Sequence, residues 1–195
     1  MLSYVDDSLF DCIEKNIINY HQMFPLLPLK DLYWENILNN SLIEIGFKTE
    51  WEPGSHKVGA DVEIIGGVKN GRISCKGGSL TDKSTRPSIS ISSYRTTNFK
   101  TLDEKLSYFD EGHEDVIFSL ASVKPLKKDS FTLKYIMSIF FPLKFSSMNW
   151  HKNGDDWSGE DGIYKADIAY KMSEQLWYKV PLDTVLDGRE FTFDQ

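Results

Sequence analysis

The feature that most restricts the fold of this chain is a change in hydrophobic periodicity near Glu50. Before Glu50, apolar residues recur at the 3.6-residue spacing of amphipathic helices, and after it short segments alternate with the period of two that is typical of strands. We therefore expect helices over residues 7–23 and 30–46, followed by strands. This order predicts a mixed α/β fold, with N-terminal helices and then a mixed β-sheet flanked by helices.

Turn-forming residues divide the second part of the sequence into short elements. Strands over residues 60–65 and 72–76 flank a hairpin connection that ends in Asn70-Gly71, and Gly77-Gly78 is expected to end the second of these strands. We expect the remaining elements over residues 87–92 (strand), 101–111 (helix), 115–123 (strand), 131–141 (mixed), 149–162 (polar loop) and 176–182 (strand).

Length and cysteine content favour one domain in a reducing compartment. A chain of 195 residues is long enough for one large core, and Cys12 and Cys75 have no zinc-binding spacing. The most apolar stretch, residues 135–145, is too short to span a bilayer, and the N-terminal residues are acidic where a secretory signal is basic. We expect a single cytoplasmic domain over residues 1–195 that does not enter a membrane.

Charge is distributed unevenly along this acidic chain. The formal net charge is −7, yet residues 68–105 have a local balance of +5, which leaves −12 on the remainder. A basic segment within an acidic protein is compatible with a focused site for a polyanion and equally with a solvated basic face.

The residues with the clearest chemical pattern lie on the two strands around the Asn-Gly turn. Alternation places Asp61 and Glu63 on one face of the first strand, and Ser74 and Lys76 on one face of the second. If the strands pair, carboxylates and an ammonium group meet on one patch. Hard oxygen ligands for Mg²⁺ and a positive group beside a phosphate are what a metal-dependent phosphodiesterase needs. The same residues would also suit a surface cross-strand charge cluster.

This pattern resembles the PD-(D/E)XK nuclease superfamily, and within it the type II restriction endonucleases. The resemblance covers roughly residues 30–120, including the segment from Ser92 to Lys105. It implies a restriction-endonuclease-like core in which Asp61 binds the metal and Lys76 is the motif lysine. The main-chain carbonyl of Cys75 would be a further metal ligand, and Ala60 stands where the family usually has proline.

Ser74 departs from the family pattern, because the family usually has Glu or Asp at this position. A carboxylate from elsewhere would then complete the site. Glu63 lies on the correct strand face, and Glu35 lies at the edge of the apolar stripe of its helix, so both are donors to consider. Glu44 falls nearly opposite that stripe and is a poor donor.

Residues that could contact DNA fall in two places, and each also suits a solvated surface. Arginine, lysine and hydroxyl side chains form phosphate and base-edge contacts, and the segment around Trp150 adds residue types that recognise bases. The DNA-contact candidates are Lys83, Arg86, Ser93, Tyr94, Arg95, Thr96, Lys100, His151, Lys152 and Asn153.

The resemblance implies a Mg²⁺-dependent site-specific deoxyribonuclease that hydrolyses duplex DNA and uses no organic cofactor, with Mn²⁺ as a substitute metal. A homodimer would match a palindromic site. The catalytic core would span about residues 30–125, and residues 126–195 would supply recognition and dimerisation elements. The alternatives are a repair or junction-resolving nuclease of the same superfamily, and a non-catalytic member that binds DNA or a protein.

Overall fold

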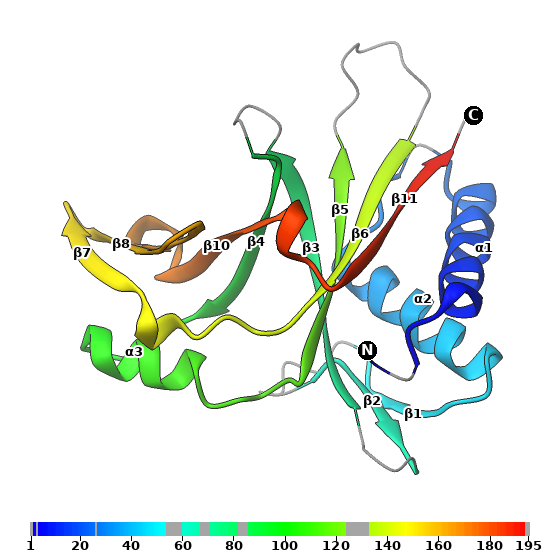
Figure 1. Cartoon of the computed structure of the whole chain (residues 1–195), viewed down its shortest axis with the longest axis horizontal. Helices are drawn as coiled ribbons and strands as arrows, with labels where there is room; N and C mark the ends of the chain where they lie inside the picture. The colour runs from blue at the N-terminus through cyan, green and yellow to red at the C-terminus, as the bar shows by residue number, and fades with distance from the viewer. Residues whose placement is uncertain are drawn as a thin grey trace.

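A computed structural model describes residues 2, 4–25, 27–53, 60–66, 71–81, 86–123 and 133–193 of the chain. These residues form three α-helices and one mixed sheet of eleven strands (Figure 1). The mixed α/β class expected from the sequence is confirmed. None of the described helices has the length and hydropathy that crossing a membrane requires.

Two of the three described helices begin at a side-chain cap. Helix α1 (Asp7–Met23) is preceded by Asp6, whose carboxylate accepts a hydrogen bond from the Leu9 amide at 3.0 Å. Helix α2 (Asp31–Glu44) buries Trp34, Leu38 and Leu42 in the hydrophobic core that it shares with α1 and the sheet. Helix α3 (Leu102–Phe109) begins with a capping box between Thr101 and Glu104.

The strands run mostly antiparallel, in the order β11-β6-β5-β3-β4-β10-β9-β8-β7, with β2 also beside β3 and β1 beside β2. The parallel neighbours are β3 and β5, which are paired from Ile73 with Val116 to Ser79 with Ser122. The strand bounds are β1 Lys48–Trp51, β2 Val62–Ile65, β3 Gly71–Thr81, β4 Ser88–Arg95, β5 Val116–Val123, β6 Leu133–Phe140, β7 Asn149–Asn153, β8 Asp156–Asp161, β9 Tyr164–Ala169, β10 Gln175–Pro181 and β11 Asp187–Phe193.

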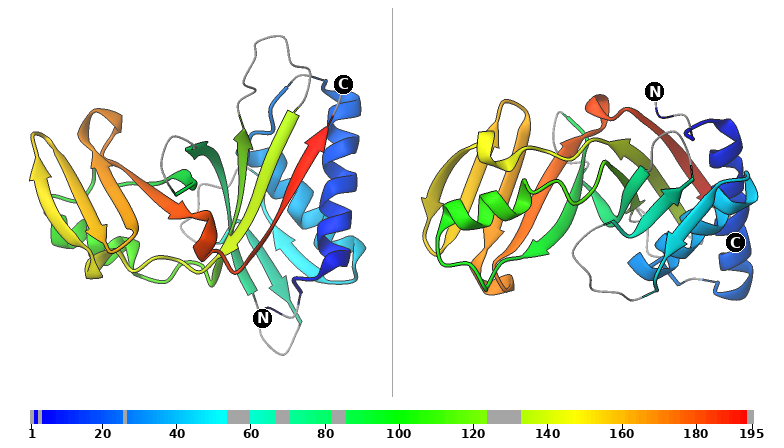
Figure 2. Two further views of the ribbon diagram at one scale, coloured as in Figure 1. Left: turned by 45° about the horizontal axis from the view of Figure 1, so that its top comes forward. Right: turned by 90° about the horizontal axis from the view of Figure 1, so that it is seen from below.

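Two hydrophobic cores lie on opposite faces of this sheet. Ile73 and Cys75 of β3 face the core under α1 and α2, whereas Ile89 and Ile91 face the other core, on the side toward which Gly78 points. We call α1, α2, β1–β3, β5, β6 and β11 the first half, and α3, β4 and β7–β10 the second half. Figures 1 and 2 show α1 and α2 at one end of the sheet and α3 at the other.

Each half combines segments from both sides of the boundary near residue 125 at which the catalytic core was expected to end. Helix α3 and β4 precede that boundary yet belong to the second half, and β11 returns to the first half beside β6. Each half is therefore assembled from separated segments of the chain.

Two local predictions are wrong. Strand β3 does not end at Gly77-Gly78 but continues to Thr81, because Gly78 to Thr81 pair with β4. Residues 149–162 form the hairpin β7–β8 rather than a polar loop, and Gly154 in its turn has φ +64°. The hairpin connection expected at residues 66–71 lies mainly outside the described residues.

Candidate functional site

The candidate site lies where β3 changes partners along one edge. Residues Gly71 to Ile73 pair with β2, and Gly78 to Thr81 pair with β4 on the same edge, since β5 occupies the opposite edge. Between these pairings, the edge of β3 from Ser74 to Gly77 has no strand partner in register among the described residues. Asp61, just before β2, donates its amide to the Ile73 carbonyl at 2.9 Å and so reaches this gap.

Three donors from consecutive residues of β3 converge on one oxygen of Asp61. Oδ2 of Asp61 accepts hydrogen bonds from Ser74 Oγ at 3.0 Å, from the Cys75 amide at 2.7 Å and from Lys76 Nζ at 3.4 Å. The Asp61 and Lys76 side chains are 24% and 19% exposed, so solvent reaches both. The hydrogen bond from the Cys75 amide holds the Asp61 carboxylate in place. The structure therefore brings together three residues that the sequence placed in one site.

Cys75 contributes its backbone and not its thiol. Its side chain is buried in the core of the first half, and burial raises the pKa of the thiol well above its usual range. In a strand, the N–H and C=O of one residue point to the same edge. Because the Cys75 amide donates to Asp61, its carbonyl also points to the gap in β3.

Glu35 lies on the turn of α2 that approaches this gap. Its Oε2 accepts a hydrogen bond from Trp51 Nε1 at 3.3 Å, which ties α2 to β1. Partial burial raises the pKa of Glu35, and the negative charges of Asp61 and Asp31 add to the rise, while Trp51 and Lys76 oppose it. The carboxylate is thus within electrostatic reach of both Asp61 and Lys76.

Glu63 shares a strand face with Asp61 but is directed at other partners. It lies opposite Arg72 on β3 and Glu50 on β1. Its charge helps to raise the pKa of Arg72, a rise caused first by the hydrogen bond of that guanidinium to Asp115. Two residues along a strand span about 7 Å. Of the two carboxylates considered from the sequence, Glu35 has the closer electrostatic relationship to Asp61 and Lys76.

Asp31 is a residue of this region that the sequence analysis missed. It begins α2, one turn before Glu35, and its carboxylate lies where a Cβ at Gly77 would be. The two glycines after Lys76 leave little open space, because Asp31 fills the space at Gly77 and Ile89 approaches Gly78. The spacing of Asp31 and Glu35, four residues apart at a helix start, was the signal available.

A cavity of about 460 Å³ opens beside Asp31 and Gly77. It extends from the start of α2 across β3, β4 and β5 to Trp177 of β10. Its strand residues are mostly small, and four contribute hydroxyl groups, namely Ser79, Ser90, Ser92 and Ser122.

The predicted DNA-contact residues are not equivalent in the structure. Thr96 is fully buried and its hydroxyl donates to the Glu174 carbonyl at 2.7 Å, so a DNA contact by this side chain is wrong. Tyr94 donates to Glu114 at 2.7 Å beneath an aromatic cluster, and burial raises its pKa, which identifies a structural role. Arg86 is bonded to Asp183 at 2.8 Å.

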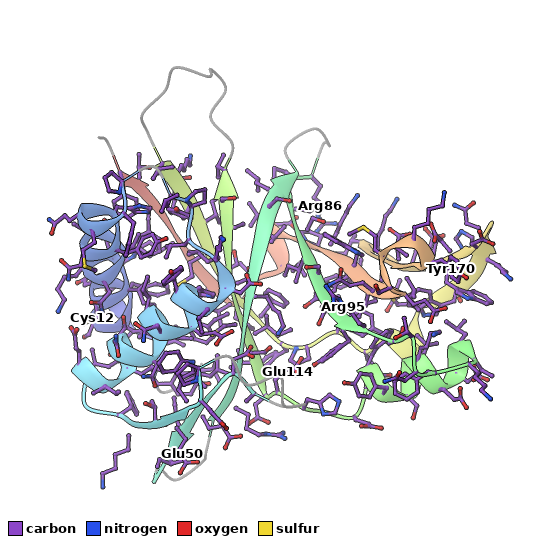
Figure 3. All side chains as sticks on the ribbon, turned by 180° about the vertical axis from the view of Figure 1, so that it is seen from behind. Cys12, Glu50, Arg86, Arg95, Glu114 and Tyr170 are labelled. Atoms are coloured by element: carbon purple, nitrogen blue, oxygen red, sulfur yellow. The ribbon has the colours of Figure 1, made fainter. Side chains whose placement is uncertain are left out.

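The remaining DNA-contact candidates differ in accessibility. Arg95 is exposed at the end of β4, where Figure 3 labels it, and Ser93 beside it is half-buried. Lys100 is exposed just before α3, and Lys83 lies outside the described residues. The three residues of the Trp150 segment, which are His151, Lys152 and Asn153, are exposed on β7.

The oxygen donors present could hold Mg²⁺ only together with other ligands. Within the described ranges, no group of three or more His, Cys, Asp or Glu side chains is arranged to bind a metal. Mg²⁺ is commonly held by one or two carboxylates with waters and substrate phosphate oxygens. Asp61, Glu35 and the Cys75 carbonyl fit that kind of partial site.

Comparisons with protein-family models, with curated proteins and with solved structures find no match to this chain. The function is therefore argued from the geometry at Asp61 and Lys76.

Proposed function

We propose that the protein is a Mg²⁺-dependent deoxyribonuclease of the PD-(D/E)XK type that hydrolyses phosphodiester bonds of duplex DNA at a short specific sequence. The observation that most supports this proposal is the meeting of Asp61 and Lys76 at the gap in β3, where a backbone amide also donates to Asp61. A carboxylate and an ammonium group held in this way, with the Glu35 carboxylate within electrostatic reach of both, suit a phosphate-containing substrate.

The order of the elements supports the same proposal. Helix α2 is followed by the antiparallel strands β1, β2 and β3, and β5 then joins the far edge of β3 in parallel. This is the helix-first, mixed-sheet arrangement that the family resemblance implies, with Asp61 just before β2 and Lys76 on the neighbouring strand β3.

Each residue of the site has a distinct role in the proposed hydrolysis. Asp61 and Glu35, with the Cys75 carbonyl, would hold Mg²⁺, which when bound supplies positive charge that polarises the phosphate and stabilises the departing 3′ oxygen. Lys76 orients the attacking water and offsets negative charge on the phosphate. Ser74, which is 1% exposed, holds Asp61 in position through its hydroxyl. The water oxygen bonds to phosphorus as the bond to the 3′ oxygen breaks; the water gives up a proton to solvent, and the departing 3′ oxygen takes one up from solvent, which leaves a 5′-phosphate and a 3′-hydroxyl.

A homodimer remains part of this proposal, since two-fold symmetry matches a palindromic DNA site and supplies two active centres. A cytoplasmic location remains part of it as well.

A non-catalytic role in DNA or protein binding is the second candidate function. It is favoured by the position of Ser74, which replaces a carboxylate with a hydroxyl that bonds to Asp61. With Ser74 and Lys76 both directed at Asp61, the site is also self-consistent as a structural cluster on the edge of β3.

Cleavage of DNA with a matched pair of lysine variants distinguishes these candidates. Unmethylated phage-sized duplex DNA is incubated with the protein in Mg²⁺, with EDTA as one control. Lys76→Ala removes the site lysine, and Lys134→Ala removes a surface lysine that pairs with Glu190 at 2.6 Å. We expect discrete fragments from the wild type and from Lys134→Ala, and intact DNA with EDTA or Lys76→Ala.

Other outcomes assign other functions. A smear that depends on Mg²⁺ and Lys76 would favour the repair or junction-resolving alternative. Equal cleavage by the wild type and Lys76→Ala would show that the site is misassigned. Intact DNA in both Mg²⁺ and Mn²⁺, over several sequence-diverse substrates, would favour the non-catalytic candidate.

A further inference from the structure

A second cavity, of about 540 Å³, lies in the second half of the molecule, remote in the sequence from Asp61 and Lys76. Three segments surround it: residues 100–105 at the start of α3, residues 152–157 of the β7–β8 hairpin, and residues 170–174 before β10. Figure 3 shows Tyr170, in the last of these segments, at the end of the molecule away from α1 and α2. The volume is within the range of small-ligand sites.

A buried ion pair fixes one wall of this cavity. Lys105 is 4% exposed, and its ammonium group donates to the Thr96 carbonyl at 2.7 Å, to the Phe99 carbonyl at 2.8 Å and to Glu174 Oε2 at 2.8 Å. Glu174 has φ +48°, in the left-handed region that side chains rarely adopt. Because all three ammonium protons are used, Lys105 holds this wall in place and is not available to a ligand.

An aromatic ring and ammonium groups are presented at the cavity. Tyr170 is 57% exposed, and its amide is fixed by a hydrogen bond to Asp156 at 2.7 Å. Lys152 Nζ lies 6.0 Å from the centroid of the Trp157 ring, a cation–π contact that keeps the ammonium at the cavity wall. Lys100 is exposed and also lines the cavity.

Two carboxylates complete the lining. Asp103 and Asp155 are both exposed, and neither is in an ion pair with another described residue. An aspartate accepts hydrogen bonds from the exocyclic amino group of a base such as cytosine. Of the acidic residues that follow Lys152, Asp155 lines this cavity, where it could accept such a hydrogen bond.

We propose that this cavity binds one nucleobase together with its neighbouring phosphate. The base stacks on Tyr170, an exocyclic amino group donates to Asp155, and the phosphate lies between Lys100 and Lys152. The inference that the nucleotide belongs to a DNA strand rests on the proposed function, and it makes the second half a base-recognition element. Aromatic stacking and lysine–phosphate contacts together are typical of nucleic-acid sites.

Binding in EDTA tests this inference without any need for cleavage. The affinity of fluorescein-labelled single-stranded and duplex oligonucleotides is measured by anisotropy for the wild type, Tyr170→Ala, Tyr170→Phe and Lys152→Gln. Lys165→Gln is the charge-matched control, since Lys165 is exposed on β9 and does not line this cavity. Titration with the four deoxynucleoside monophosphates tests whether a free nucleotide is the ligand.

We expect Tyr170→Ala to weaken oligonucleotide binding by about 5- to 150-fold, the effect of losing one stacked base, and Tyr170→Phe to retain wild-type affinity. Lys152→Gln should lower the salt dependence of binding by about one charge, and Lys165→Gln should not. Asp155→Ala, which removes the acceptor, should reduce any preference for cytosine or adenine.

The results separate this inference from the proposed nuclease activity. Unchanged binding by Tyr170→Ala and Lys152→Gln, or no DNA binding by the wild type, would overturn the assignment to DNA even if cleavage occurs. Loss of binding in these variants, with no cleavage by the wild type in Mg²⁺, would support the cavity and refute the nuclease. Saturation by a monophosphate, with no response to oligonucleotides, would support a free nucleotide as the ligand.

Discussion

The carboxylate of Asp31 lies over Gly77, in the space that a side chain at position 77 would enter. This contact joins the first turn of α2 to the gap in β3 that also exposes Lys76. The contact requires a residue without a Cβ at position 77. The neighbouring Gly78 is instead packed against Ile89 and the Ser90 carbonyl of β4.

The two glycines should therefore respond differently to alanine. A Cβ at Gly78 would lie 2.9 Å from Ile89 Cγ2 and 3.1 Å from the Ser90 carbonyl oxygen, so a strand must shift. We expect Gly78→Ala to lower the free energy of unfolding by about 1–3 kcal/mol. Gly77→Ala should cost less than about 0.5 kcal/mol, since the exposed Asp31 side chain can rotate away. Urea denaturation measures both, and a larger loss in Gly77→Ala would contradict this packing.

Glu35→Gln should stabilise the protein at neutral pH while abolishing cleavage. The pKa of Glu35 is raised by burial, so above pH 4.5 the folded state binds more protons than the unfolded state, and stability falls as pH rises through that window. Gln carries no ionisable group, so the Glu35→Gln variant does not lose stability in this way as pH rises. The melting temperature of Glu35→Gln should exceed that of the wild type by more at pH 7 than at pH 4.

Glu44→Gln on the same helix is the control for that prediction. Hydrogen bonding to Lys15 lowers the pKa of Glu44, so its stabilising effect is present above pH 4.5 and is lost as pH falls through the lowered value. Glu44→Gln should therefore lower the melting temperature slightly at pH 7 and leave cleavage intact. A change in melting temperature of the same sign in Glu35→Gln and Glu44→Gln at pH 7 would argue against the partly buried position of Glu35.

Replacing Lys105 with methionine should destabilise the second half strongly. The substitution leaves Glu174 and two carbonyl groups without their buried partner. Breaking a buried pair in this way costs about 3–5 kcal/mol, and Lys105→Met with Glu174→Gln should recover part of that loss. Urea denaturation reports the cost. Lys100→Met, at an exposed position, should change stability little.

His21 should make the protein less stable below neutral pH. The ring is buried against Tyr135, whose hydroxyl is 3.1 Å from Nε2, and burial lowers the pKa of His21 below 6.5. The unfolded state then binds more protons, so stability is full above pH 6.5 and falls as pH drops through the lowered value. Melting temperatures between pH 7 and pH 5 should fall less in His21→Gln than in the wild type. An equal fall would contradict this role.

Local patterns in the sequence were sufficient for the helices. Helices α1 and α2 fall within one or two residues of their predicted ends, because their apolar spacing is a local signal, and α1 also begins at the Asp6 cap. The turn in β7–β8 had such a signal in Asn153-Gly154, yet the polar residues around it favoured a loop.

Interactions between distant segments could not be predicted in this way. Glu35 and Glu63 were equivalent in the sequence, and only the pairing of β1 with β2 placed Trp51 beside Glu35 and Arg72 opposite Glu63. Gly77-Gly78 suggested the end of a strand, but pairing with β4 extends β3 past both residues. In each case a tertiary contact decided between local alternatives of similar free energy.

The salt bridges between α1 and β11 have a consequence for how this protein folds. Arg189 on β11 contacts Asp7 at 2.7 Å and Asp11 at 2.6 Å, so residues separated by nearly the whole sequence must meet. Contacts of such long sequence separation slow folding. During synthesis, β6 has an unpaired edge until β11 has left the ribosome, and that edge is a hazard for aggregation. Efficient production should therefore depend on rapid completion of translation, or on chaperone protection of the nascent chain, until residues 187–193 have emerged.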